Sequence, residues 1–133
     1  MASAAQRKSV ENVSEATAII TNPTHFAVAL KYIVGEPGAP EVVAMGRGNV
    51  ANEIINKGKE KNIRVYRSPL LARALFFTSE IGKEISEKLY NAVAVALAYI
   101  YKIDKGEFID EPQIDIPEDL RFNENGQVIK DKD

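Results

Sequence analysis

The chain contains no cysteine and no tryptophan, and its 133 residues include one histidine, His25. The absence of cysteine excludes disulfide bonds, iron–sulfur clusters and thiol catalysis, and it fits a reducing compartment. A single histidine excludes a metal site built from several histidines, and a Ser-His-Asp triad is possible only around His25. We therefore expect no metal and no cofactor, and any catalysis must depend on few residues.

Long hydrophobic runs are also absent. The longest run, Ala92–Tyr101, is far shorter than the roughly 20 residues that cross a bilayer. Residues 1–8 lack the basic-then-apolar order of a signal peptide. We therefore expect a soluble chain with a single compact domain, because 133 residues are enough for one core without disulfide staples.

The net charge of −2 hides an uneven distribution. Residues 104–133 carry ten acidic and four basic side chains, which leaves residues 1–103 with a net charge of +4. Most of that excess lies in segment 57–67, which we interpret as a solvated helix end. A basic segment also suits nucleic acid or an acidic protein. We expect no nucleic-acid partner, because the chain lacks tryptophan and an aromatic-rich sheet motif.

Apolar periodicity and turn residues predict alternating strands and helices. Strands are expected at 16–20, 26–33, 41–45 and 63–66. Helices are expected from a cap at Asn49 to about Lys61, over 70–77 after Ser68-Pro69, and from Ser86 through Ile100. This alternation indicates an α/β fold, with a four-stranded mixed sheet covered by about four helices. The strands around Val42 and Val65 should form a right-handed crossover and pair in parallel.

Composition divides the chain into three parts. Residues 1–15 are predicted to be the end of a linker or of an N-terminal helix, and residues 16–104 form the compact domain. Residues 105–133 are acidic, and their apolar residues lack a sustained period, so we expect a disordered or loosely docked tail. Both ends of the chain are thus predicted to be flexible.

The most informative motif is Asn22-Pro23-Thr24-His25, which lies between two β-rich apolar runs. An Asn usually degrades when the next backbone nitrogen attacks its side-chain amide, but Pro23 has no N–H. The reverse attack stays open: the Asn22 side-chain nitrogen attacks its own backbone carbonyl, closes a succinimide and releases Pro23 as a new N-terminus. A fold must then hold that nitrogen roughly 3 Å from the carbonyl carbon. A tight turn with Asn first and Pro second suits this geometry, and the same residues also suit an ordinary polar hairpin loop.

Longer stretches of the sequence resemble one known family. Segment 19–32 around this motif resembles the self-cleavage region of the FlhB/YscU/SpaS family, the export-switch proteins of type III secretion. Blocks that resemble later parts of that family follow in the same order, at 40–46, 71–75, 80–85 and 89–101. The resemblance covers roughly 16–101, and it is nearer to the flagellar branch. Family members also carry N-terminal transmembrane helices and a basic linker. We therefore expect either the cytosolic domain of a longer protein or a stand-alone soluble relative.

The resemblance implies that the domain cleaves itself once, between Asn22 and Pro23, and helps to switch export from early to late substrates. Asn22 would be the nucleophile and Pro23 the leaving group. Thr24 and His25 would orient the loop, and His25 would also be able to relay a proton. We expect this to be a single-turnover event, with both fragments remaining associated.

The resemblance also implies a location and partners. The location is the cytoplasmic face of the bacterial inner membrane, with membrane contact only through an N-terminal region. The implied partners are export apparatus components, export substrates with their chaperones, and a hook-length or needle-length control protein.

The alternative hypothesis is an uncleaved docking module of the export machinery, which binds substrates, chaperones or other components. The variant Asn22→Ala separates the two, because a docking module should be indifferent to it.

We expect a structural role for Arg73, with its stem packed and its guanidinium paired to a carboxylate, although a partner contact remains open. Phe76 and Phe77 are candidates either for exposed contacts or for the core.

Overall fold

The computed structural model describes residues 3–23, 25–33 and 35–130. Its centre is a four-stranded sheet with the strand order β3-β2-β1-β4. The strands are β1 (Ala18–Asn22), β2 (Phe26–Lys31), β3 (Glu41–Arg47) and β4 (Arg64–Arg67). β1 and β3 pair with β2 in antiparallel fashion, whereas β4 pairs with β1 in parallel. This is the mixed sheet that the sequence predicts.

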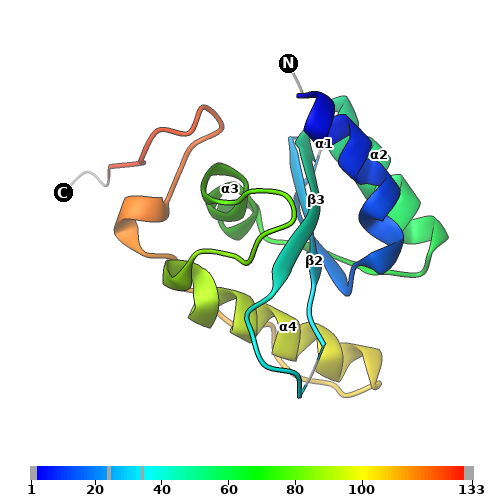
Figure 1. The fold of residues 1–133 in the computed structure, drawn as a ribbon. Coiled ribbons are helices and arrows are strands. Elements are labelled where there is room, and N and C mark those ends of the chain that lie inside the picture. The colour runs from blue at the N-terminus through cyan, green and yellow to red at the C-terminus, as the bar shows by residue number, and fades with distance from the viewer. Residues whose placement is uncertain (1–2, 24, 34, 131–133) are drawn as a thin grey trace.

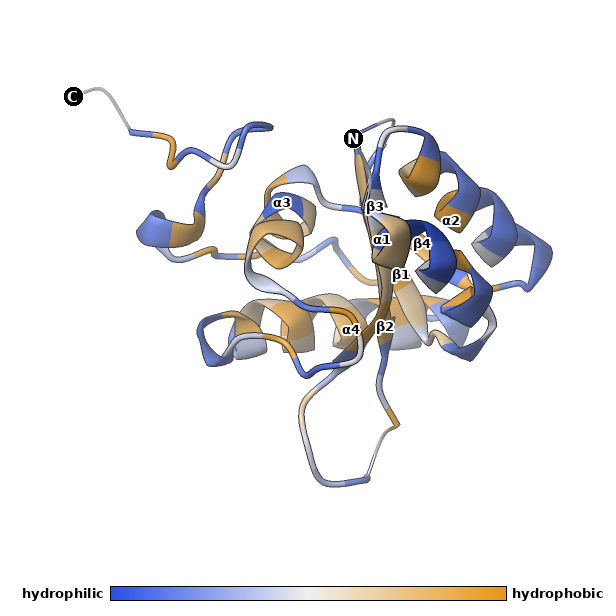
Figure 2. Ribbon diagram, turned by 45° about the horizontal axis from the view of Figure 1, so that its top comes forward, coloured by the Kyte–Doolittle hydropathy of each residue, from blue (hydrophilic) through white to orange (hydrophobic). Residues whose placement is uncertain are grey.

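Helices cover both faces of the sheet (Figure 1). One face carries the helix α1 (Ala4–Ser9), the 3₁₀ segment η1 (Val10–Glu15) and the helix α2 (Asn49–Glu60). The other face carries α3 (Pro69–Thr78) and α4 (Tyr90–Asp104), together with the short 3₁₀ segments η2 (Glu87–Leu89) and η3 (Glu118–Leu120). Figure 2 shows α2 with hydrophilic residues facing outward and hydrophobic residues facing the sheet. The α/β class and the set of covering helices are therefore confirmed.

Strand β1 is buried along its whole length, because alternate side chains enter the two opposite cores. Ile19 packs in the core beneath α2, and Ile20 packs in the larger core beneath α3 and α4. Neither side chain is exposed to solvent. Such a strand belongs in the interior of the sheet, with a neighbour on each side.

The pairing of β4 differs from the prediction. The strands joined by α2 run parallel, but β4 adds to the free side of β1 and does not pair with β3. The reason is that β2 already occupies the inner side of β3, while β1 is apolar on both faces and requires a second neighbour. As a result, β1 is an interior strand although it comes first in the sequence.

Glycine explains how closely α2 approaches the sheet. Glycine lowers helix stability, but α2 runs through Gly58 to Glu60, close to the predicted end at about Lys61. A Cβ atom built on Gly58 would lie 2.3 Å from Cδ1 of Ile19, so the absent side chain makes room for β1. The helix also begins one residue earlier than predicted, because the N-cap is Gly48 and not Asn49, so that Asn49 is already helical.

The start of α4 is also different from the prediction. Ser86 caps η2 instead of α4, and its Oγ accepts a hydrogen bond of 3.3 Å from the backbone nitrogen of Lys88. The helix α4 then begins at Tyr90.

The two predicted flexible tails are docked over much of their length. At the N-terminal end, Ser9 Oγ accepts a hydrogen bond of 3.3 Å from the Met45 backbone nitrogen, and Val13 is fully buried. At the C-terminal end, Ile116 and Leu120 are buried in the core of α3 and α4. Of the two alternatives predicted for residues 105–133, disorder or loose docking, Ile116 and Leu120 show docking. The apolar residues of the C-terminal tail dock from an irregular, turn-rich chain, so they show no helical or strand period.

Candidate functional site

The hairpin between β1 and β2 holds the motif that the sequence singles out. Asn22 is the last residue of β1 and pairs with Phe26, the first residue of β2. The backbone nitrogen of His25 donates a hydrogen bond of 2.9 Å to the carbonyl oxygen of Asn22. Asn22 and Pro23 thus occupy the first two positions of a tight turn. Thr24, the remaining residue of the motif, lies outside the described residues.

The surroundings of Asn22 differ from those of a typical loop residue. Asn22 is only 8% exposed, because it continues the buried strand β1. Its carbonyl oxygen already accepts the His25 N–H, which withdraws electron density from the carbonyl carbon. A donor in this position also stabilises negative charge that develops on the oxygen when a nucleophile attacks the carbon. The turn therefore polarises the carbonyl of the peptide bond between Asn22 and Pro23.

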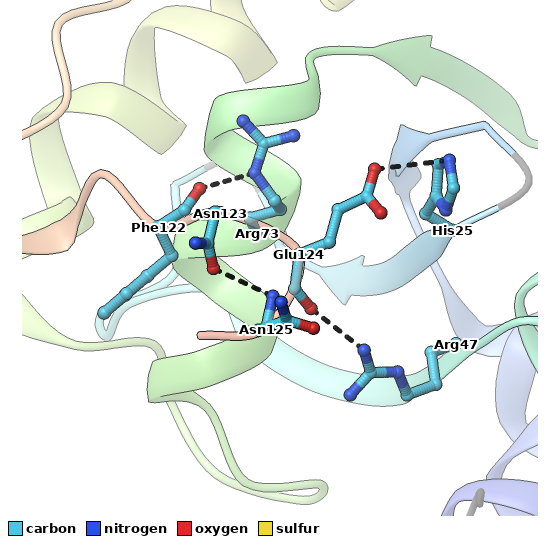
Figure 3. Close-up of polar contacts among 7 residues, drawn as sticks. All are labelled: His25, Arg47, Arg73, Phe122, Asn123, Glu124 and Asn125. Carbon is cyan, nitrogen blue, oxygen red and sulfur yellow. Dashed lines mark hydrogen bonds and ion pairs between the residues drawn. The ribbon is translucent and has the colours of Figure 1, made fainter. Parts of the chain in front are cut away.

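His25 is held through both its backbone and its side chain. Its carbonyl oxygen accepts a hydrogen bond of 3.0 Å from the nitrogen of Gly48, at the end of β3. Its Nε2 lies 3.3 Å from Oε1 of Glu124, and both side chains are about half exposed. Figure 3 shows Glu124 between His25 and Arg47. The sequence identifies His25 as a candidate, but not its partner from the C-terminal tail.

Arg47 is a further residue of this region that the sequence analysis missed. Its guanidinium lies over the ring of Phe26, 5.0 Å from the ring centroid. Its Nη2 donates a hydrogen bond of 2.9 Å to the backbone oxygen of Glu124 (Figure 3). A signal was present, since Arg47 lies two residues after the predicted strand 41–45, but only the pairing of β2 with β3 brings it next to the motif.

Arg73 has a structural contact, although not the predicted one. Its Nε donates a hydrogen bond of 2.6 Å to the backbone oxygen of Phe122, so the partner is a carbonyl and not a carboxylate. Phe76 is buried in the core, and Phe77 packs against that core from a partly buried position. Of the two predicted roles for Phe76 and Phe77, exposed contact or core residue, the structure supports the core for both.

Metal binding finds no support in the described ranges 3–23, 25–33 and 35–130, where no group of three acidic, histidine or cysteine side chains is placed to hold an ion. Within the same ranges, no helix has both the length and the apolar character that a bilayer crossing requires.

A groove of about 1020 Å³ lies on the face of the domain that carries α4. Its lining comes mainly from α4, from Tyr32 directly after β2 and from the loop before β3. Most of the exposed surface of the lining is apolar, with contributions from Ala39, Pro40, Ala94, Leu97 and Ala98. The groove could not be predicted from the sequence, because segments that lie far apart in the chain form it.

Comparison with known proteins identifies the family. A family model described as the FlhB HrpN YscU SpaS family matches residues 1–100. The chain belongs to this family. Among curated relatives, it is 48% identical over 96 residues to the flagellar biosynthetic protein FlhB of Aquifex aeolicus, which covers 72% of this chain and 27% of that protein. It is 41% identical over 125 residues to the FlhB of Salmonella typhimurium, which covers 90% of this chain and 33% of that protein.

Solved structures agree with this assignment. The cytoplasmic domain of FlhB from Shewanella putrefaciens superimposes with a TM-score of 0.77 and 38% identity, covering 89% of this chain and 96% of that one. A mutated EscU C-terminal domain matches with a TM-score of 0.64 and 31% identity, covering 68% of this chain and 91% of that one. The chain thus spans about a third of the length of the curated FlhB relatives, and it corresponds to the part solved as a cytoplasmic domain.

Proposed function

We propose that this domain cleaves its own backbone between Asn22 and Pro23 and that the cut changes which substrates a type III, flagellar-type export apparatus accepts. The observation that carries the proposal is the hydrogen bond of 2.9 Å from the His25 N–H to the Asn22 carbonyl oxygen. This bond closes the turn at the susceptible peptide bond and polarises the carbonyl that is attacked.

The proposed reaction is an Asn cyclisation. The side-chain nitrogen of Asn22 bonds to its own backbone carbonyl carbon, and the bond from that carbon to the Pro23 nitrogen breaks. The proton lost by the amide nitrogen is balanced by the proton that the departing Pro23 amine gains, with solvent as the carrier. Water then opens the succinimide at residue 22. The net reaction is hydrolysis, and it occurs once per chain.

The roles of the four motif residues follow from this chemistry. Asn22 supplies the nucleophile and the electrophile, and Pro23 is the leaving group. His25 contributes its backbone N–H, while its side chain tunes the loop or relays a proton. Thr24 is proposed to orient the loop.

The fragments should remain associated, because β1 is an interior strand. Residues 1–22 contribute α1, η1 and β1, and β1 pairs with β2 on one side and with β4 on the other. Ile19 and Ile20 are fully buried in two different cores. Cleavage of the loop removes chain connectivity but none of this packing.

A cut that leaves the core intact alters mainly the loop surface, and a partner that contacts this surface can distinguish the two states. We propose that such partners are export apparatus components, export substrates with their chaperones, and a length-control protein. The proposed location is the cytoplasmic face of the bacterial inner membrane.

The test is the intact mass of freshly purified protein under denaturing conditions, beside an Asn22→Ala control and a native sizing run. We expect masses for residues 1–22 and 23–133, which co-elute natively, and a single mass for Asn22→Ala. One stable full-length mass over days at neutral to alkaline pH would refute self-cleavage.

An uncleaved docking module is the second candidate function, and the apolar groove beside α4 is the observation that favours it. An apolar segment of an export substrate is the proposed occupant. Ala98→Glu puts a charge into the groove lining, whereas Asn91→Glu puts the same charge on an exposed part of α4 outside the lining. If docking is the function, Ala98→Glu weakens binding of a purified export substrate at least tenfold, while Asn91→Glu and Asn22→Ala leave it unchanged. Equal binding by all the variants would refute this candidate.

A further inference from the structure

The acidic C-terminal tail returns to the loop between β1 and β2, here called the cleavage loop. It does so as a small hairpin of residues 121–129, here called the C-terminal hairpin. Its strands are joined by an isolated bridge between Phe122 and Val128, and the nitrogen of Ile129 donates a hydrogen bond of 2.7 Å to the oxygen of Arg121. At the tip, Asn123 Oδ1 accepts hydrogen bonds from the backbone nitrogens of Asn125 and Gln127, at 2.9 and 3.0 Å. The tip is therefore internally braced.

Contacts with α3 hold the hairpin against the domain. The Phe122 and Phe77 rings meet edge to face, with centroids 5.5 Å apart. Gly126 lies directly over the same Phe77 ring, since a Cβ built on it would be 2.9 Å from Cε1. Arg73 donates its hydrogen bond of 2.6 Å to the Phe122 oxygen. These contacts fix the position of the tip next to β2 and β3.

Glu124, at this tip, joins the C-terminal hairpin to the cleavage loop. Its backbone oxygen accepts the hydrogen bond from Arg47, which fixes the main chain, and its carboxylate lies 3.3 Å from Nε2 of His25 (Figure 3). The main-chain bond to Arg47 leaves the carboxylate free to engage His25. His25 is thus held by β1, by β3 and by the tail at the same time.

We propose that Glu124 is a positioning residue for the cleavage loop: its carboxylate holds the His25 side chain and thereby restrains the turn that presents the Asn22 carbonyl. This inference rests on the proposed self-cleavage. It gives the acidic tail a role in the reaction, although the tail is about a hundred residues from the motif in the sequence.

The size of the effect follows from the exposure of the pair. Exposed ion pairs contribute little to stability, so Glu124 does not hold the hairpin in place, and the aromatic contacts with α3 do. The carboxylate instead narrows the range of His25 conformations. Loss of the contact between Glu124 and His25 should slow cleavage about two- to fivefold, because contacts between exposed charged side chains contribute only small free energies.

The first measurement is the rate of cleavage. It is monitored through the intact mass of protein that is made rapidly by cell-free synthesis. We expect Glu124→Ala to slow the reaction about two- to fivefold. Glu124→Gln keeps the length and one hydrogen-bond acceptor, so it should retain most of the wild-type rate. The matched control is Asp110→Asn, which removes one negative charge from an exposed position of the same tail and should have no effect.

A second measurement reports the contact without any cleavage. His25 is the single histidine of the chain, so its ring signals in an NMR spectrum are unambiguous. In the Asn22→Ala background, Glu124→Ala should shift the His25 ring signals, and Asp110→Asn should not. A chain that ends after Leu120 keeps the buried Ile116 and Leu120 but loses the C-terminal hairpin, and it should shift the same signals.

The outcomes separate this inference from the proposed function. Shifted His25 signals together with slower cleavage in Glu124→Ala support the positioning role. Shifted signals with an unchanged cleavage rate overturn it, as does an equal loss of rate in Asp110→Asn. If the wild-type chain does not cleave, the proposed function itself fails, while the NMR comparison still shows whether Glu124 restrains His25.

Discussion

The backbone N–H of His25 donates a hydrogen bond of 2.9 Å to the carbonyl oxygen of Asn22, whose carbon forms the peptide bond to Pro23. The donor belongs to the main chain and not to the imidazole. In the proposed reaction, this contact stabilises the oxygen when the Asn22 amide attacks, and the side chain of His25 is secondary.

The first prediction separates the two parts of His25. Because His25→Ala keeps the N–H donor, it should slow cleavage less than tenfold, whereas His25→Pro removes the donor and should slow cleavage by about a hundredfold or more. Rates are followed by denaturing mass spectrometry, and thermal unfolding of each variant reports whether the fold is retained. A folded His25→Pro variant that cleaves as fast as His25→Ala would contradict the role of the main-chain donor.

The second prediction concerns the leaving residue. In Pro23→Gly, residue 23 has a backbone N–H, so its nitrogen is able to attack the Asn22 amide, a route that proline blocks. The expected product is a full-length chain in which Asn22 has deamidated, with a mass increase of about one dalton. Peptide mapping locates the change. If Pro23→Gly instead releases residues 1–22 at the wild-type rate, the restriction imposed by proline is irrelevant.

The turn could be predicted from the sequence, since Asn22-Pro23 lies between two apolar runs that form paired strands. The pairing of β4 with β1 could not be predicted, because the choice of edge depends on which strand is apolar on both faces after all the elements have assembled. For the tail, the composition leaves disorder and loose docking open. Ile116, Leu120 and Phe122 dock individually from an irregular chain, so they show no period that would decide between the two.

The third prediction tests the packing that, in our proposal, keeps the two fragments together. Gly58→Ala should destabilise the uncleaved Asn22→Ala protein by about 1–3 kcal/mol despite the better helix propensity of alanine, because its Cβ would lie 2.3 Å from Ile19 Cδ1. Ile19→Val removes that Cδ1 atom, so the double variant should lose less stability than the two single variants together. Asn56→Ala, on the exposed side of α2, is the control. Additive losses in urea unfolding would rule out the close approach of α2 to β1.

The fourth prediction concerns alkaline pH. Burial, followed by the hydrogen bond and the charge of Glu111, raises the pKa of Tyr66 to about 12. Between pH 10 and pH 12 the unfolded chain loses a proton that folded Tyr66 retains, so this contribution to stability is complete below about pH 10 and falls as the pH rises. Tyr66→Phe should therefore show a weaker loss of stability across that interval.

The control for this prediction is Tyr90→Phe, a change on an exposed tyrosine of α4. Urea unfolding at several pH values measures both variants. Equal pH dependence in Tyr66→Phe and in the unaltered protein would show that folding does not raise the pKa of Tyr66.

The chemical state of residue 22 in the released fragment tests the central claim most directly. If Asn22 cyclises, the early fragment 1–22 ends in a succinimide and is one water molecule lighter than the hydrolysed fragment. Later time points should contain fragments that end in asparagine and in isoasparagine. Quenched time points analysed by high-resolution mass spectrometry and fragmentation distinguish these species. Unmodified asparagine alone at every time point would mean direct hydrolysis of the peptide bond and would contradict the proposed mechanism.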